Sequence, residues 1–247
     1  QISLLPPAPT HPEFTFSGRM LPADEVGGDF YDVLWDPLSN RLWITIGDVS
    51  SHGLGSGLVM MMTQAAFSAH FRATPNAPPG QVLTTVNALL IEAVAKRLRD
   101  DKYVTAQLLQ YEGNGDFLCG GGHQSPLVWR AATRRAQYVE MGGPWLGLVP
   151  ALPEVDTDTL HLEVGDVLCL YSDGITEARN EMEELFEPHR LASALEAAMD
   201  SVKDFDHVAD EVIATVNRFT TLRHDDWTLL LVRREKAGSP GGDDAHC

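Results

Sequence analysis

Basic residues are scarce in this chain of 247 residues, in which 18 Lys and Arg stand against 35 Asp and Glu. The formal net charge of −17 makes a surface that repels the phosphate backbone of nucleic acids and the head groups of anionic membranes. We therefore expect no nucleic-acid partner, and the same repulsion argues against a metal-dependent nuclease.

Long hydrophobic runs and cysteines are few as well. The longest apolar stretches, such as 167–171 and 227–232, are far shorter than the ~20 residues that a membrane-spanning helix needs. Three widely spaced cysteines predict neither a disulfide framework nor a zinc site. The first residues lack the cationic and apolar segments of a signal peptide. These features predict a cytoplasmic protein without membrane insertion.

Apolar residues make up 44% of the chain, which is enough for a substantial core. Apolar patterns typical of strands occur at 41–47, 103–109, 117–119, 127–129, 137–141, 167–171 and 227–232. Helical spacing of apolar residues occurs at 58–71, 82–98, 188–199 and 205–219. This order of elements predicts an α+β fold in which antiparallel sheets pack face to face with helices outside.

Prolines and glycines mark the two ends of the expected domain. We expect a linker at 1–12, a folded domain at 13–235 and a disordered tail at 236–247. Within the domain, alternation at 41–47 predicts a strand half-covered by another layer. The continuous apolar runs at 167–171 and 227–232 predict central strands buried on both faces.

Acidic residues stand at the ends of predicted strands. Asp48 and Asp173 follow strands, whereas Asp29 and Asp225 precede them. Because the end of one antiparallel strand lies beside the start of its neighbour, all four side chains can share one edge. Carboxylates gathered this closely repel one another unless a cation lies among them.

The type of ligand favours a hard cation. Oxygen ligands without Cys or paired His select Mg²⁺ or Mn²⁺ rather than zinc. Two such ions ~3.5–4 Å apart activate a water molecule and hold a phosphoryl group, so the natural reaction is hydrolysis of a phosphate ester. Each acidic motif taken singly is more often a turn with a solvated acid, and only the four together, in this order, indicate such a site.

Several ordered motifs carry a resemblance to a known family. They lie at 25–32 (EVGGDFYD), 47–49 (GDV), 122–123 (GH), 143–147 (GPWLG), 170–178 (LYSDGITEA) and 225–228 (DDWT). Over about 14–234 the chain resembles the bacterial SpoIIE/RsbU branch of the protein phosphatase 2C (PPM) family. The resemblance implies a four-layer αββα sandwich and metal-dependent removal of phosphate from phosphoserine or phosphothreonine in proteins.

The resemblance also implies a ligand set for two Mn²⁺ or Mg²⁺ ions. The residues that match it are Asp29, Asp48, the carbonyl of Val49, Asp173 and Asp225. Asp48 resembles the carboxylate that bridges both ions. Asp173 and Asp225 resemble ligands of one ion, and Asp29 resembles a ligand of the other, directly or through water. Asp226 stays an alternative to Asp225, because strand alternation turns one of the two away from the edge.

The expected catalytic residues are Asp48, Asp173 and His52, the last as general acid for the leaving serine. Eukaryotic relatives place their histidine two residues after the bridging Asp rather than four, so His52 is equally well explained as a turn residue. His123 is expected to be structural. Ser51 stands where many relatives have Gly, which reaches backbone angles that Ser avoids, so the loop geometry is expected to differ.

The resemblance implies the output domain of a bacterial signalling protein. The expected partners are an upstream sensor or receiver domain and a phosphoprotein substrate, such as an anti-sigma-factor antagonist; a homodimer stays open. The alternative is a pseudophosphatase that keeps the fold and acts as a regulated protein-binding module. Retention of all four aspartates argues against this alternative.

Overall fold

The computed structural model describes residues 9–24, 26–155, 157–220 and 222–236. Its strands form two five-stranded antiparallel sheets. The first sheet has the order β1 (Phe14–Leu21), β10 (Trp227–Arg234), β9 (Val167–Tyr171), β6 (Leu127–Arg130), β7 (Arg135–Tyr138). The second has the order β2 (Phe30–Asp36), β3 (Arg41–Val49), β4 (Val104–Gly113), β5 (Asp116–Gly120), β8 (Asp158–His161).

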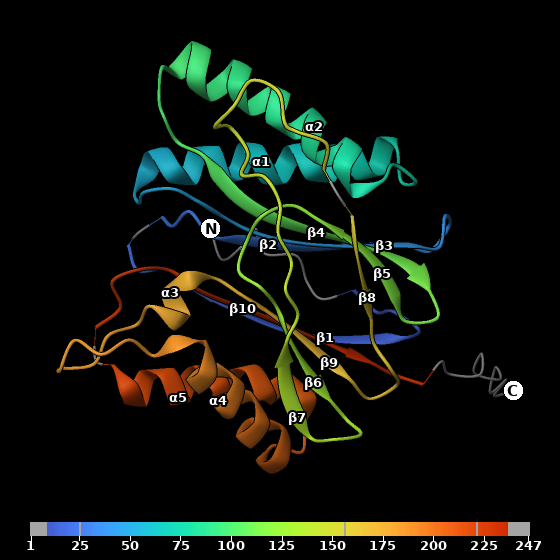
Figure 1. Ribbon diagram of the computed structural model, residues 1–247, viewed down its shortest axis with the longest axis vertical. Coiled ribbons are helices and arrows are strands. Elements are labelled where there is room, and N and C mark those ends of the chain that lie inside the picture. Colours follow the sequence, from blue (N-terminus) through green and yellow to red (C-terminus); the bar gives the residue numbers. More distant parts are fainter. Residues whose placement is uncertain (1–8, 25, 156, 221, 237–247) are drawn as a thin grey trace, which may run out of the picture.

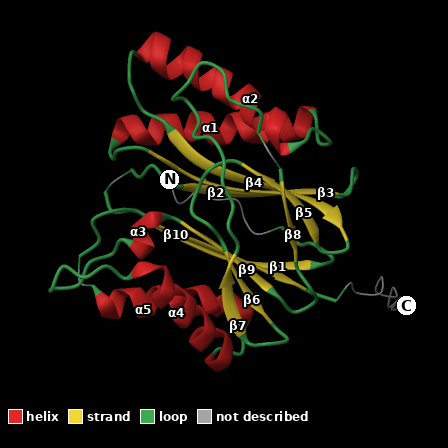
Figure 2. Cartoon of the chain, in the orientation of Figure 1, coloured by secondary structure: helices red, strands yellow, loops and turns green. Residues whose placement is uncertain are grey.

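Helices cover the outer face of each sheet (Figures 1 and 2). The second sheet carries α1 (Leu54–Ala73), α2 (Pro79–Leu90) and its π-helical continuation η2 (Ile91–Leu98). The first sheet carries α4 (Glu187–Ser201), the 3₁₀ turn η3 (Phe205–His207) and α5 (Val208–Phe219), and the short α3 (Asp173–Thr176) follows β9. The expected four-layer αββα sandwich is therefore confirmed.

Three layers of buried apolar side chains hold these four layers together. One lies between the first sheet and α4 and α5, one between the two sheets, and one between the second sheet and α1 and α2. The strand at 167–171 contributes side chains to two of these layers, as its continuous apolar run predicts. Among the described residues, no helix has both the length and the apolar character of a membrane span.

Some expectations from the sequence are wrong in detail. The strand at 41–47 is covered on both faces rather than one, because the α1 residue Phe71 stacks on Trp43 with ring centroids 4.4 Å apart. The expected strand at 137–141 is β7, which ends at Tyr138. Residues 1–8 of the expected linker and 237–247 of the expected tail lie outside the described residues.

Candidate active site

The acidic motifs of both sheets meet at one end of the sandwich. In the second sheet, Asp48 lies at the end of β3, and Asp29 directly precedes β2. In the first sheet, Asp173 begins α3 just after β9, and Asp225 lies two residues before β10. The two sheets present these ends on the same side, near α3 in Figure 1.

Asp226 joins the two sheets at this end. Its side chain is buried, with 5% exposure. One carboxylate oxygen accepts a hydrogen bond from the backbone N–H of Ala23 at 2.8 Å, and the other accepts from that of Asp29 at 3.4 Å. The segment that precedes β2 is therefore held against the start of β10. The sequence motif contained Asp226, but its linking role depends on the packing of the two sheets.

Burial and mutual repulsion raise the pKa values of the clustered carboxyl groups. The pKa of Asp48 is raised to about 8 by burial first and then by the charges of Asp173, Asp225 and Asp226. The pKa of Asp29 is raised well above its usual range by burial and by the charge of Asp48. The pKa values of Asp173 and Asp225 are raised in the same direction, chiefly because neighbouring protein atoms displace part of the solvent around each carboxyl group. The four acids thus lie close enough to influence one another's ionisation.

Two hydroxyl groups of the first sheet act on Asp29 in the opposite direction. Ser172 and Thr228 offer hydrogen bonds that lower the pKa of the Asp29 carboxyl. They are also tied to each other, since the backbone N–H of Thr228 donates to the Ser172 hydroxyl at 3.0 Å. Both belong to motifs visible in the sequence, but no pattern there assigns them to Asp29.

A narrow space faces the oxygens of Asp48 and Val49. A Cβ atom at Gly28 would lie 2.6 Å from the carbonyl oxygen of Val49 and 2.9 Å from a carboxylate oxygen of Asp48. Any side chain at this position would fill the space, so glycine is required there. Space beside carboxylate and carbonyl oxygens fits a hard divalent cation, whose charge would offset their repulsion.

The carboxylates do not already form a coordination shell. Across residues 9–24, 26–155, 157–220 and 222–236, no three Asp, Glu, His or Cys side chains are grouped as the ligands of one metal ion. Both oxygens of Asp226 are used by backbone amides. Asp225 is exposed, and one of its oxygens accepts from the N–H of Asp226 at 2.8 Å. Of this pair, Asp225 is therefore the acid with an oxygen open to solvent.

The loop after β3 carries His52 at the rim of the site. The His52 side chain is 83% exposed, and its Nδ1 lies 3.0 Å from a carboxylate oxygen of Asp24. The charge of His52 also lowers the pKa of Asp225, which places the ring near the acidic cluster. Ser51 has a φ angle of 69°, in the left-handed region that favours glycine. The substitution of Ser for Gly therefore lies at a strained position of this loop.

His123 supports the strand that carries Asp48. Its Nδ1 lies 3.0 Å from the hydroxyl of Thr105, which is the register partner of Asp48 in β4. Burial lowers the pKa of His123 to about 4, so the ring is neutral at pH 7. A neutral ring that holds the strand next to Asp48 agrees with the structural role expected from the sequence.

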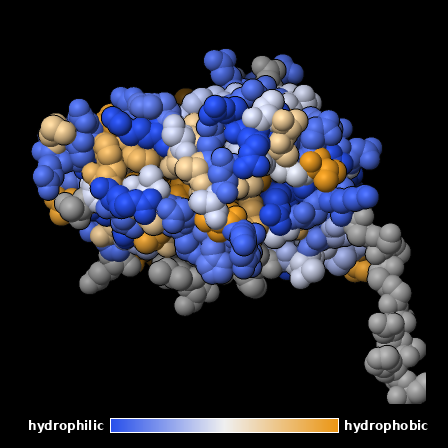
Figure 3. Space-filling view, turned by 90° about the horizontal axis from the view of Figure 1, so that it is seen from below, coloured by the Kyte–Doolittle hydropathy of each residue, from blue (hydrophilic) through white to orange (hydrophobic). Residues whose placement is uncertain are grey.

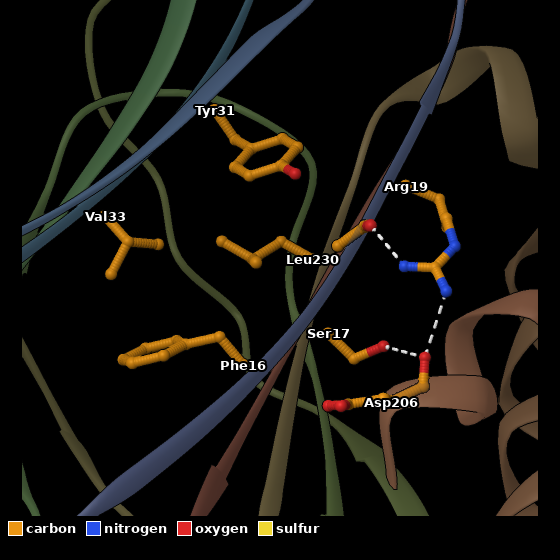
Figure 4. Close-up of a pocket in the computed structure, with 8 residues that line it drawn as sticks. Phe16, Ser17, Arg19, Tyr31, Val33, Asp206 and Leu230 are labelled. Carbon is orange, nitrogen blue, oxygen red and sulfur yellow. Dashed lines mark hydrogen bonds between the residues drawn. The ribbon is translucent and has the colours of Figure 1, made fainter. Parts of the chain in front are cut away.

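A cavity of about 410 Å³ lies between β1 and β2, and none of the four clustered acids lines it (Figure 4). Arg19 borders it and donates hydrogen bonds to the carbonyl oxygens of Gly18 and Asp206. The same guanidinium pairs with the carboxylate of Asp210 in α5. Arg19 is therefore committed to holding β1 against η3 and α5, and the cavity is separate from the acidic cluster.

Two five-stranded antiparallel sheets between helix pairs, with carboxyl groups gathered at one end, define a serine phosphatase domain of the protein phosphatase 2C type. The particular family follows from the sequence. The family model of Stage II sporulation protein E (SpoIIE) matches residues 39–235, and the chain belongs to this family.

Three known proteins illustrate the relationship. Phosphoserine phosphatase RsbU of Bacillus subtilis (strain 168) is 26% identical over 225 residues, which cover 87% of this chain and 62% of RsbU. The crystal structure of the RsbU and RsbW domains of Rv1364c from Mycobacterium tuberculosis is 25% identical, with a TM-score of 0.74 over 93% of this chain and 62% of that one. The crystal structure of RsbX in complex with magnesium shares the fold at 16% identity, with a TM-score of 0.63 over 93% of this chain and 99% of that one.

The chain therefore spans less than two thirds of the length of RsbU and of the Rv1364c structure.

Proposed function

We propose that this domain is a metal-dependent phosphoserine/phosphothreonine protein phosphatase. The observation that supports this most is the raised pKa of Asp48, to about 8, under the influence of burial and the neighbouring acids Asp173 and Asp225. A folded protein gains nothing in stability from crowding partly buried carboxyl groups, so their proximity indicates a site built for a cation.

The proposed ligands are those expected from the sequence. Asp48 would face both ions, with the carbonyl of Val49 beside it. Asp173 and Asp225 would hold one ion, and Asp29 would serve the other, directly or through water. Their oxygen-only chemistry suits Mg²⁺ or Mn²⁺. When bound, two such ions lower the pKa of water and offset negative charge on a phosphoryl group.

His52 is the proposed general acid. Its ring is exposed at the rim of the cluster and lies beside Asp24, whose carboxylate would orient it. A protonated ring here can donate its proton to the serine oxygen that leaves when the phosphate ester is cleaved. The left-handed backbone of Ser51 directly precedes His52 in this loop.

The proposed setting is bacterial signalling. RsbU, to which the chain is similar, is named as a phosphoserine phosphatase, and the Rv1364c structure combines an RsbU domain with an RsbW domain. By analogy we propose a phosphoprotein substrate, such as an anti-sigma-factor antagonist, and a sensor or receiver domain upstream of a catalytic domain at 13–235.

The test measures hydrolysis of para-nitrophenyl phosphate with Mn²⁺ or Mg²⁺. Asp48→Ala and Asp173→Ala should each lower kcat by at least about 100-fold, because each removes a proposed ligand. Calorimetric titration with Mn²⁺ alone should show the matching loss of metal affinity. The control is Asp36→Ala, an exposed acid at the far end of β2, which should retain activity. A wild-type protein that is inert with both ions and binds neither would instead favour the pseudophosphatase.

A further inference from the structure

Two stacked aromatic rings lie where β4 begins, beside the end of β3 that carries Asp48. The rings of Tyr103 and Trp145 are nearly parallel, with an interplanar angle of 7° and centroids 5.1 Å apart. Despite this contact the Trp145 side chain is 46% exposed. A large aromatic side chain that is held in place and yet open to solvent is typical of a binding surface.

The strand register puts this pair on the same face of the sheet as Asp48. Asp48 is the direct partner of Thr105 in the β3–β4 ladder. Ser50 and Tyr103 extend this pairing beyond the strands, because the Ser50 N–H donates a hydrogen bond to the Tyr103 carbonyl oxygen at 2.9 Å. Side chains directly opposite or two residues apart share a face. Tyr103 therefore lies about 7 Å along the strand from the level of Asp48.

The aromatic pair is held rigidly. Leu146, next to Trp145, exchanges two backbone hydrogen bonds with Val104, next to Tyr103, at 2.9 and 2.8 Å. Trp145 also packs on Gly122, where a Cβ atom would lie 3.0 Å from the indole ring. These contacts fix the loop backbone beside Trp145, so binding of a ligand there would cost little conformational entropy.

The charges nearby favour a cation as the ligand of this surface. Asp101, two residues before Tyr103, and Asp225 of the acidic cluster are both exposed. The nearby Lys102 is mostly buried and paired with Asp100 at 2.8 Å, so its charge is already compensated. The whole chain carries a net charge of −17. An Arg or Lys side chain laid on the indole face would gain from both the ring and the surrounding acids.

We propose that Tyr103 and Trp145 form a specificity platform that binds a cationic side chain of the substrate, about two residues away from the phosphoserine. The proposal rests on the proposed phosphatase function, because it defines the substrate class of that same site. The spacing follows from the structure, since two residues of an extended peptide span the same ~7 Å that separates Tyr103 from Asp48 along the strand.

The test uses synthetic phosphoserine peptides that are otherwise neutral and differ at one position. Arg, Ala or Leu is placed two residues before or two residues after the phosphoserine, and kcat/KM is measured with Mn²⁺. We expect the wild-type protein to prefer one of the Arg peptides over its Ala counterpart by about fivefold. Trp145→Ala should reduce this ratio to about one, and Trp145→Phe should leave an intermediate value because Phe attracts a cation less strongly than Trp.

The ratio is taken within each variant, so a general loss of activity or folding cancels. The matched control is Tyr138→Ala, an aromatic side chain of similar exposure on β7, which should keep the ratio. A Leu peptide as good as the Arg peptide, or an Arg preference that survives Trp145→Ala, would overturn the platform.

A binding measurement separates this proposal from the proposed function. Fluorescence polarisation of labelled peptides reports the Arg preference whether or not the phosphate is removed. Arg-dependent binding that is lost in Trp145→Ala, without any hydrolysis, would retain the platform and overturn the phosphatase. Hydrolysis without any preference for Arg would retain the phosphatase and overturn the platform.

Discussion

Asp32 is a buried acid outside the candidate active site. It lies in β2 with 7% exposure, and among the described residues its Oδ1 has no hydrogen-bond partner. Burial raises the pKa of Asp32 to about 6, while the N–H of Val33, the charge of Arg72 and the side chain of Gln64 act in the opposite direction. At neutral pH the fold therefore contains an ionised carboxylate that its surroundings solvate poorly.

The sign of the resulting pH dependence follows from the two pKa values. An unfolded Asp loses its proton near pH 3.8, whereas the folded Asp32 keeps it until about pH 6. Between these values the folded state binds more protons, so the free energy of unfolding falls as the pH rises. The contribution of the protonated acid is fully present below about pH 3.8 and is lost as the pH passes through 6.

Asp32→Asn removes this titration. As the pH rises from 4 to 7.5, we expect the free energy of unfolding of the variant to increase relative to that of wild type. The increase should be up to about 3 kcal/mol, which corresponds to the shift in the Asp32 pKa. Urea unfolding at both pH values, with chelator present, measures the difference. Asp36→Asn is the control on the same strand. A hydrogen bond from Ser39 lowers the pKa of Asp36, so the stability of this variant relative to wild type should change with pH in the opposite direction. An equal effect of Asp32→Asn at both pH values would contradict a raised pKa of Asp32 in the folded state.

At the scale of elements, one buried side chain couples α2 to the loop that carries Trp145. Asn87 is 1% exposed. Its Nδ2 donates to the carbonyl of Val149 at 3.0 Å, and its Oδ1 accepts from the N–H of Gly147 at 2.8 Å. The side chain thus satisfies two backbone groups of a loop that has no strand partner of its own at these positions.

Asn87→Ala should lower the free energy of unfolding by about 3 kcal/mol, because it leaves both of these backbone groups without a partner. Urea unfolding measures the loss, and faster amide exchange at Gly147 should locate it in the loop. Thr84→Ala, an exposed position on the same helix, should change stability by no more than about 0.5 kcal/mol. Equal effects of the two variants would show that Asn87 does not hold the loop.

The elements that could be predicted from sequence are those whose pattern is local. The continuous apolar run at 167–171 predicts a central strand, and β9 has these bounds. The helical spacing at 82–98 predicts a helix, but the change to π-helical geometry at Ile91 leaves no mark in the apolar pattern. The four-residue strand β8 and the four-residue helix α3 are too short to produce a periodic signal.

The same distinction holds for the candidate site. Antiparallel pairing at strand ends predicts that all four acids share one edge. It accounts for Asp29 beside Asp48 in the second sheet and for Asp173 beside Asp225 in the first. The meeting of the two pairs depends on how the sheets stack. The hydrogen bond from the Asp29 N–H to Asp226 joins residues 197 positions apart and depends on how the two sheets stack. The Tyr103–Trp145 contact depends in the same way on the path of a loop between the sheets.

At the scale of the whole molecule, charge is the least balanced property. The net charge of −17 produces repulsion across the surface, and Figure 3 shows hydrophilic residues over most of the face formed by α4 and α5. Ion pairs act against this repulsion, but most of them are exposed, such as Lys96–Glu92. Exposed pairs contribute only about 0–1 kcal/mol each. The pair between Arg130 and the buried Asp166 is an exception that salt screens less.

Because repulsion involves all the surplus acids and exposed pairs are weak, screening should stabilise the fold. We expect the free energy of unfolding, measured in urea with chelator present, to rise by about 1 kcal/mol between 20 and 300 mM NaCl. A variant with Glu140, Glu154 and Glu181 replaced by Lys changes the charge by two at each exposed position, from −17 to −11. Its gain with salt should be smaller than that of wild type. A fall in stability with salt would mean that the ion pairs, rather than the surplus of acid, dominate the electrostatic energy of this domain.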